Sequence, residues 1–191
     1  FLDDALGLSS AAIGGVLLVM VLMQALGSVI WGRWVDRNGP TRYMVIGWSF
    51  VVASLLGVGL VGSLLAGNVA VLGMILLLGS FQFFIAATQI PMLPMIDTAT
   101  NRALGEGNPG LAFGVFGAAW AAGIIVGPLL VGPAFDLFGS WAIALGGLAI
   151  PAFGALLLTV TNRDLLHDCY EEEIGKRKSK SEVVNEALQP E

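Results

Sequence analysis

The sequence predicts an all-α protein, a polytopic membrane helix bundle of about five transmembrane helices. Of its 191 residues, 56% are hydrophobic and 12% are charged, and the mean hydropathy is +0.83. Soluble domains carry about 25% charged residues. Four stretches contain no Asp, Glu, Lys or Arg, and each is long enough for the roughly 20 residues that a helix needs to cross the hydrocarbon core. They lie between Asp4 and Arg33, Arg42 and Asp97, Glu106 and Asp136, and Asp136 and Arg163.

Two other fold classes are excluded by the same stretches. Buried strands of a soluble α/β protein would be short, about 4–8 residues, with polar loops between them. A transmembrane β-barrel would alternate polar and apolar residues, and the run Val16–Leu22 does not alternate. Helices remain, because a helix satisfies its own backbone hydrogen bonds in lipid.

The helix boundaries follow from the ends of the apolar stretches. The second and third spans come from one long uncharged run, which we divide at Ala66-Gly67-Asn68 because Gly and Asn suit a turn. A polar cytoplasmic tail over 162–191 is expected to be disordered. The predicted spans are 9–31, 43–65, 69–96, 111–134 and 141–161.

The distribution of basic residues predicts the orientation. All nine Lys and Arg residues fall in the segments 32–42, 97–110 and 162–191, whereas the opposite side carries only acidic charges. Cytoplasmic loops are enriched in Lys and Arg, so we expect an outer N-terminus and a cytoplasmic C-terminus. Five spans beginning outside, without a starting methionine, also suggest a fragment.

The segment 32–42 reads Gly-Arg-Trp-Val-Asp-Arg-Asn-Gly-Pro-Thr-Arg. It resembles the signature loop of the major facilitator superfamily, G-x-x-x-D-R-x-G-x-x-R, at every fixed position. The resemblance implies a cytoplasmic loop between the second and third helices of a six-helix half, which acts as a conformational latch in the outward-open state. The matching residues are Gly32, Asp36, Arg37, Gly39 and Arg42.

Physical chemistry makes such a latch plausible. Asp36 can meet a helix N-terminus, which carries about half a positive charge, and Asn108-Pro109 is a good start for the fourth span. The alternative is that the loop supplies only topogenic positive charge. Because Asp36 adds nothing to that charge, we favour the latch.

The fourth span is rich in glycine, and part of it resembles the G-x-x-x-G-P-x-x-G-G pattern of the drug:proton antiporter branch. Val131 stands where the pattern has its first paired glycine. Small residues four apart let helices approach closely, so ordinary helix packing is the alternative interpretation. The motif residues are Gly123, Gly127, Pro128 and Gly132.

Two features favour the C-terminal half of a twelve-helix transporter, helices 8–12. The span 69–96 lacks the intramembrane arginine of exporter N-terminal halves, and a polar tail follows the last span. The resemblance therefore implies a partner outside this sequence, the missing N-terminal half, and relates the chain most closely to drug:proton antiporters and vesicular amine transporters.

The spans contain no ionisable residue, so the candidate substrate cavity is uncharged. Ionisable groups inside a membrane are the usual functional residues, and a proton-coupling carboxylate would have to lie outside this sequence. The alternatives are interhelical hydrogen bonding for the glutamines and packing for the aromatic rings. The candidate cavity residues are Gln24, Gln82, Gln89, Phe113, Phe116 and Trp120, with Trp31, Trp34 and Trp141 as interfacial anchors.

These features predict a secondary active transporter of small organic molecules in a lipid bilayer, of the exporter or antiport type, working by alternating access. Protons are the coupling ion that the resemblance implies, in a plasma, inner or organelle membrane. The spans hold no His, Cys or acid for an enzyme, and we expect no cofactor, metal or nucleic-acid partner. A non-transporting accessory or sensor protein on the same scaffold is the alternative.

Overall fold

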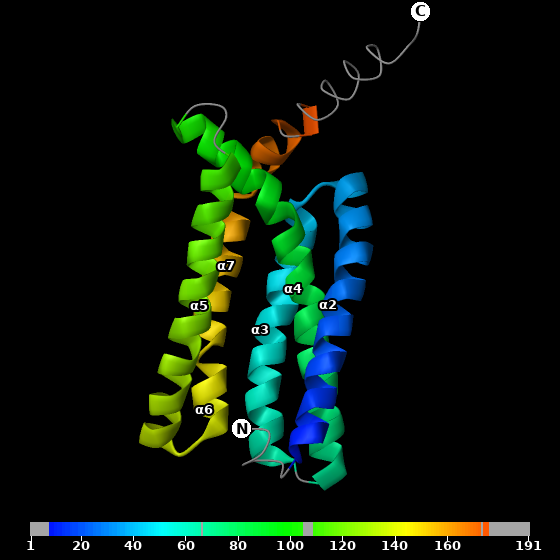
Figure 1. Ribbon diagram of the computed structural model, residues 1–191, viewed down its shortest axis with the longest axis vertical. Helices are drawn as coiled ribbons and strands as arrows, with labels where there is room; N and C mark the ends of the chain where they lie inside the picture. The colour runs from blue at the N-terminus through cyan, green and yellow to red at the C-terminus, as the bar shows by residue number, and fades with distance from the viewer. Residues whose placement is uncertain (1–7, 66, 105–108, 173, 176–191) are drawn as a thin grey trace, which may run out of the picture.

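The computed structural model describes residues 8–65, 67–104, 109–172, 174 and 175. Within these ranges all regular secondary structure is helical, and the helices run along one long axis (Figure 1). A further helical stretch, residues 163–172, follows α7 and is called the C-terminal helix below. The named helices are α2 (Ser10–Asn38), α3 (Thr41–Leu64), α4 (Gly67–Leu104), α5 (Pro109–Phe138), α6 (Trp141–Gly146) and α7 (Ala149–Thr161).

Five helical stretches are long and apolar enough to cross a membrane, which confirms the predicted fold class. Their surfaces remain largely apolar, as expected for helices that face lipid rather than water. On α2, for example, Leu18 and Val21 are each 60% exposed. The spans are Ser10–Asn38, Thr41–Val61, Gly67–Ala103, Gly110–Phe138 and Trp141–Thr161.

The signature segment is mostly helix, whereas the sequence suggested a loop over 32–42. Helix α2 is capped at its start by the Ser9 side chain, which accepts a hydrogen bond from the Ala12 N–H at 3.3 Å. It continues through Asn38, and only Gly39 and Pro40 separate it from α3. The charges in this segment mark the end of the apolar span but do not break a helix, which needs residues such as Gly and Pro to stop it.

Helix α4 is also longer than expected, because it continues eight residues beyond Ile96 to Leu104. Pro91 and Pro94 lie inside it. Proline removes a backbone donor and commonly kinks a helix, and the C-terminal part of α4 leans towards α5 (Figure 1).

The last span is one crossing made of two helices, α6 and α7. The break falls at Gly147-Leu148, four residues before Pro151. A proline ring clashes with the carbonyl of the fourth residue before it, which explains why the helix is interrupted at Gly147. The Gly147 N–H still donates to the Ile143 carbonyl at 2.9 Å, so the chain keeps its direction.

Helices α2 and α3 both pack closely against α4. These three helices are called the three-helix unit below. A Cβ atom added at Gly27 of α2 would lie 2.6 Å from the Phe83 carbonyl oxygen, and one added at Gly47 of α3 would lie 2.9 Å from the Phe84 carbonyl oxygen. Both distances are shorter than real contacts allow. Glycine is therefore required at both crossings.

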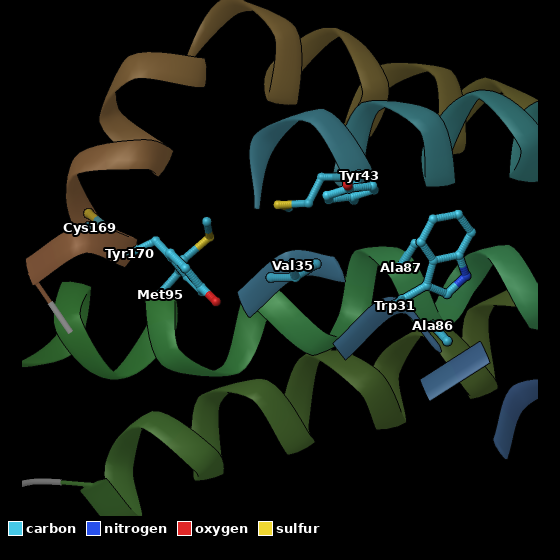
Figure 2. Packing of buried hydrophobic residues seen from close by; sticks show 9 residues of the cluster. Trp31, Val35, Tyr43, Ala86, Ala87, Met95, Cys169 and Tyr170 are labelled. Atoms are coloured by element: carbon cyan, nitrogen blue, oxygen red, sulfur yellow. The ribbon is translucent and has the colours of Figure 1, made fainter. Parts of the chain in front are cut away.

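The main buried cluster lies at the end of the bundle that carries the signature segment (Figure 2). Trp31 is 5% exposed there, and its indole N–H donates to the Phe83 carbonyl at 2.9 Å. Trp31 is therefore a core residue, not the interfacial anchor that its position in the sequence suggested. The cluster consists of Trp31, Val35, Tyr43, Met44, Ala86, Ala87, Met95, Cys169 and Tyr170.

The C-terminal helix differs from the disordered tail expected from the sequence. Its Cys169 and Tyr170 are 7% and 4% exposed and belong to the main cluster. A helix with one apolar side gains order by packing on a core, and the polar composition of the whole tail hid this short stripe. Residues 176–191 lie outside the described part of the chain.

Candidate functional site

The signature segment makes a two-residue connection that needs its glycine. Gly39 has φ +82°, a conformation that residues with a Cβ rarely adopt. Its N–H donates to the Val35 carbonyl at 2.9 Å and closes α2. Pro40 then precedes the first residue of α3. The Gly39-Pro40 pair of the signature segment thus fixes how α2 turns into α3.

Side chains beside this turn hold it to the core. The Asn38 amide donates to the Tyr43 hydroxyl at 2.9 Å. The Tyr43 ring is buried, 5.8 Å from Trp31 between ring centroids. Asp36 faces the C-terminal helix, where the Tyr170 hydroxyl donates to its Oδ1 at 3.3 Å.

This contact differs from the partner expected for Asp36. Asn108, the expected cap of the fourth span, lies outside the described residues, so the latch onto that helix stays a prediction. Arg37 and Arg42 are exposed and form no salt bridge with an acidic side chain in the described part of the chain. A Cβ atom added at Gly32 would meet nothing within 4 Å there.

The two central glutamines meet. The Gln24 side-chain amide of α2 donates to Gln89 Oε1 of α4 at 3.2 Å, and both side chains are half-buried. Gln82, two turns earlier on α4, is half-buried and does not line the cavities described below. The two residues are 65 apart in the sequence, so only the packing of α2 against α4 shows that they form a pair.

Gln89 also lines two cavities between α4 and α5. The larger, of about 300 Å³, is walled by aromatic and aliphatic side chains from α3, α4 and α5. The smaller, of about 160 Å³, lies between Gln89, Phe116, Gly117 and Trp120. The Phe116 and Trp120 rings are stacked, with centroids 6.2 Å apart. The structure thus joins Gln24, Gln89, Phe116 and Trp120 into one candidate site, called the glutamine site below.

Phe113 does not line the cavities of the glutamine site. It lines a separate cavity of about 510 Å³ at the signature-segment end, together with Asp36 and Tyr170. The other lining residues of this cavity, called the end cavity below, are Ile90, Leu93, Pro94 and Ile174.

Among the residues that line the larger cavity, sequence reasoning missed one further aromatic and one further polar side chain, Trp48 and Thr88. Trp48 lies in the second predicted span, 43–65, from which the sequence analysis named no cavity residue. Thr88 is 1% exposed and its hydroxyl donates to the Ile85 carbonyl at 2.8 Å. Its position next to Gln89 on a helix was the available signal.

The extension of α4 brings Asp97 and Asn101 into the helix, one turn apart. Each has a side-chain oxygen, Oδ1, that is buried and accepts no hydrogen bond from the described residues. An unsatisfied buried acceptor costs about 1–3 kcal/mol. Water or a further protein segment would relieve that cost at the end of α4.

In the part of the chain that the structure describes, no other element approaches the glycines of the antiporter-like motif closely. A Cβ atom added at Gly123, Gly127 or Gly132 would meet no atom within 4 Å among the described residues. Helix α5 packs against α4 and α6, and its motif face is open. The close approach predicted for these glycines is therefore not made within the described chain.

Comparison with known proteins supports the membrane bundle. Residues 1–186 match the sequence model of the Major Facilitator Superfamily. The human "MFS-type transporter SLC18B1" is 29% identical over 159 residues, covering 78% of this chain and 34% of that protein. "Solute carrier family 22 member 18" is 28% identical in rat over 88% of this chain and 30% identical in mouse over 82% of it, in each case 37% of the relative.

The chain thus spans about a third of the length of these curated relatives. No solved structure matches it. The family match covers nearly the whole chain, and the five apolar helices are those of an integral membrane protein. This chain belongs to the Major Facilitator Superfamily.

Proposed function

We propose that this chain is part of a secondary active transporter that moves small, uncharged amphipathic organic molecules by alternating access. The contact that carries the proposal is the Gln24–Gln89 hydrogen bond beside an aromatic-walled cavity. Binding sites for small molecules are concave and mostly apolar, with a few polar groups that orient the ligand.

The chemistry of the lining suggests the substrate class. The described side chains around the 300 Å³ cavity include Gln89, Thr88 and two tryptophans, and none of the lining residues is ionisable. An organic cation or anion would be desolvated there without a counter-ion from this chain, which is costly. A neutral molecule with an apolar body and one or two hydrogen-bonding groups would suit these walls.

Transport by reconstituted full-length protein tests the substrate class. Uptake into vesicles would be compared for three radiolabelled amphipaths of similar size, one neutral, one cationic and one anionic. We expect saturable uptake of the neutral compound to be fastest. The absence of saturable uptake for all three, relative to empty vesicles, would contradict a transporter, and preference for the cation would contradict the neutral class.

The glutamine site is tested by Gln89→Ala, with Gln82→Ala as the matched control on the same helix. Loss of one neutral hydrogen bond corresponds to about a three- to tenfold fall in kcat/KM. We expect this fall for Gln89→Ala and little change for Gln82→Ala, whose side chain does not line the site. Equal effects of both variants would argue against a substrate role for Gln89.

We further propose that Asp36 acts in a latch that holds one end of the bundle closed during the cycle, and that transport is proton-coupled export. The match of the signature segment supports the latch, and the glycine motif of α5 supports antiport. Asp36→Asn should lower transport while membrane insertion stays normal. An imposed pH gradient should drive substrate accumulation, and a protonophore should abolish it.

A further inference from the structure

We propose that the C-terminal helix docks reversibly on the signature segment, and we call this docked helix the clasp. Tyr170 is the positioning residue that holds Asp36 in place. The docking of this helix is independent of any substrate. Its coupling to the transport cycle rests on the function proposed above.

Polar contacts tie the C-terminal region to all three helices of the three-helix unit. The Tyr170 hydroxyl donates to Asp36 at the end of α2. The Thr41 hydroxyl at the start of α3 donates to the Arg163 carbonyl at 3.4 Å. Near the end of α4, Arg102 Nε donates to Glu172 Oε2 at 2.9 Å, and a second guanidinium nitrogen contacts the same oxygen. The clasp therefore contacts α2, α3 and α4 at the signature-segment end.

An apolar stripe accompanies these contacts. Leu166, Cys169 and Tyr170 of the C-terminal helix, and Ile174 beyond it, follow the three- and four-residue spacing of one helix face. Cys169 and Tyr170 are buried in the main cluster, and Leu166 and Ile174 are half-buried against it. Figure 2 shows Tyr170 reaching Met95 of α4 from this helix. The opposite face is exposed and charged, with Arg163, Asp164, Asp168 and Glu171. An amphipathic helix docked on a core explains this pattern.

The docked helix also shapes the end cavity. Tyr170 and Ile174 form one wall of that 510 Å³ space, and Asp36 and Phe113 line it as well. Departure of the helix would remove this wall and the hydrogen bond on Asp36 together. The position of the helix and the environment of the signature aspartate are thus linked.

The attachment is suited to release. Arg102 and Glu172 are 44% and 34% exposed, so water and salt screen their attraction. The Tyr170–Asp36 hydrogen bond, at 3.3 Å, is long. Elements whose polar contacts are exposed to water open at a lower free-energy cost than those held only by buried contacts.

The structure supplies a reporter for release, because Cys169 of the docked helix is buried against the core and is the only cysteine of this sequence. N-ethylmaleimide would be added to the full-length protein in vesicles, and modification of the Cys169 peptide followed by mass spectrometry. Rates would be divided by those of the same variant in denaturing detergent, because Arg102 lies 3.4 Å from the sulfur and could affect its reactivity directly.

We expect Tyr170→Phe, which removes only the hydroxyl, to raise the normalised rate about two- to tenfold, as for one lost hydrogen bond. Glu172→Arg should also raise it, and combining it with Arg102→Glu should bring the rate back towards the wild-type value. Glu171→Arg is the matched control, since it makes the same charge change on the exposed face and should leave the rate unchanged.

Wild-type rates in both Tyr170→Phe and Glu172→Arg would overturn the clasp. During substrate turnover the Cys169 rate of the wild-type protein should rise, and Tyr170→Phe should change kcat. Faster labelling of the variants without either effect would overturn the coupling and leave the transport proposal intact. Absence of uptake by the wild-type protein would count against the transport proposal alone, while the labelling rates would still decide the docking.

Discussion

Glycines at the helix crossings of the three-helix unit have different surroundings from the glycines of α5. In the unit, Cβ atoms at Gly27 and Gly47 would collide with backbone carbonyls of α4. Along α5, Gly110, Gly114, Gly117, Gly123, Gly127 and Gly132 have nothing within 4 Å in the described chain. A run of small residues therefore shows that a helix could be approached closely, whereas only a contact shows that it is.

The two regions also differ in burial. The unit holds the large buried side chains of the main cluster, while Ala112 is the buried residue of α5 among those described. Most of α5 is thus exposed apolar surface with a glycine face. If the proposed transporter has a second half, α5 is the helix of this chain with the most free surface to meet it.

The largest effect should come from emptying the core of the unit. Trp31→Ala removes a side chain that is 5% exposed and donates to the Phe83 carbonyl. Such truncations cost about 3–5 kcal/mol. The thermal unfolding midpoint in detergent, followed by circular dichroism, should fall strongly. Trp34→Ala is the control, since Trp34 is 47% exposed, and a similar fall for both would contradict the core role of Trp31.

A smaller effect is expected where the helices cross. Gly47→Ala would place a Cβ atom 2.7 Å from Thr88 Cγ2 and 2.9 Å from the Phe84 carbonyl oxygen. The α4 backbone cannot move away without disturbing the unit, and overpacking costs about 1–3 kcal/mol. The same melting measurement on Gly114→Ala, at an open glycine, should show no loss. Equal stability of the two variants would mean that the crossing is looser than the structure shows.

How far the sequence predicts this fold depends on the element. The apolar stretches predicted five crossings and were right about their number, because the need to hide backbone polar groups in lipid leaves a strong signal. The ends were less predictable: Asp97 and Arg102 looked like loop residues, yet α4 continues through them. Charge marks the edge of the apolar region, whereas a helix ends only where capping or proline stops it.

The residue types of the glutamine site could be predicted from the sequence, but the contacts between them could not. Polar residues in apolar spans pointed to Gln24 and Gln89, but their pairing depends on how α2 packs against α4. Phe113 and Phe116, three residues apart on α5, line different cavities. Tyr170 could not be assigned from the sequence, because an aromatic residue in a charged tail carries no sign of what it packs against. Only the docked helix shows its contact with Asp36.

A still smaller effect is expected for the polar contact inside the unit. A double-mutant cycle of Gln24→Ala and Gln89→Ala isolates their interaction. Interhelical hydrogen bonds in membranes average about 0.6 kcal/mol, so the coupling measured from unfolding free energies should be of that size. A coupling of zero would place the two amides apart in the folded protein, and the transport effect of Gln89→Ala would then need another explanation.

The smallest effect is expected at Gly123 of α5. A Cβ atom at Gly123 meets no neighbour among the described residues. The unfolding free energy of Gly123→Ala in the 191-residue chain should therefore stay within about 0.5 kcal/mol of the parent chain, as for an exposed position. Gly27→Ala, at a glycine of the packed unit, should destabilise the same chain clearly. If the glycine face of α5 packs against the proposed first half, Gly123→Ala should destabilise the full-length transporter as Gly27→Ala does. Even one added methyl group disturbs a close helix crossing. Gly123→Ala that leaves both the 191-residue chain and the full-length protein unchanged would argue that this face meets lipid, and that the motif serves ordinary helix flexibility rather than contact between halves.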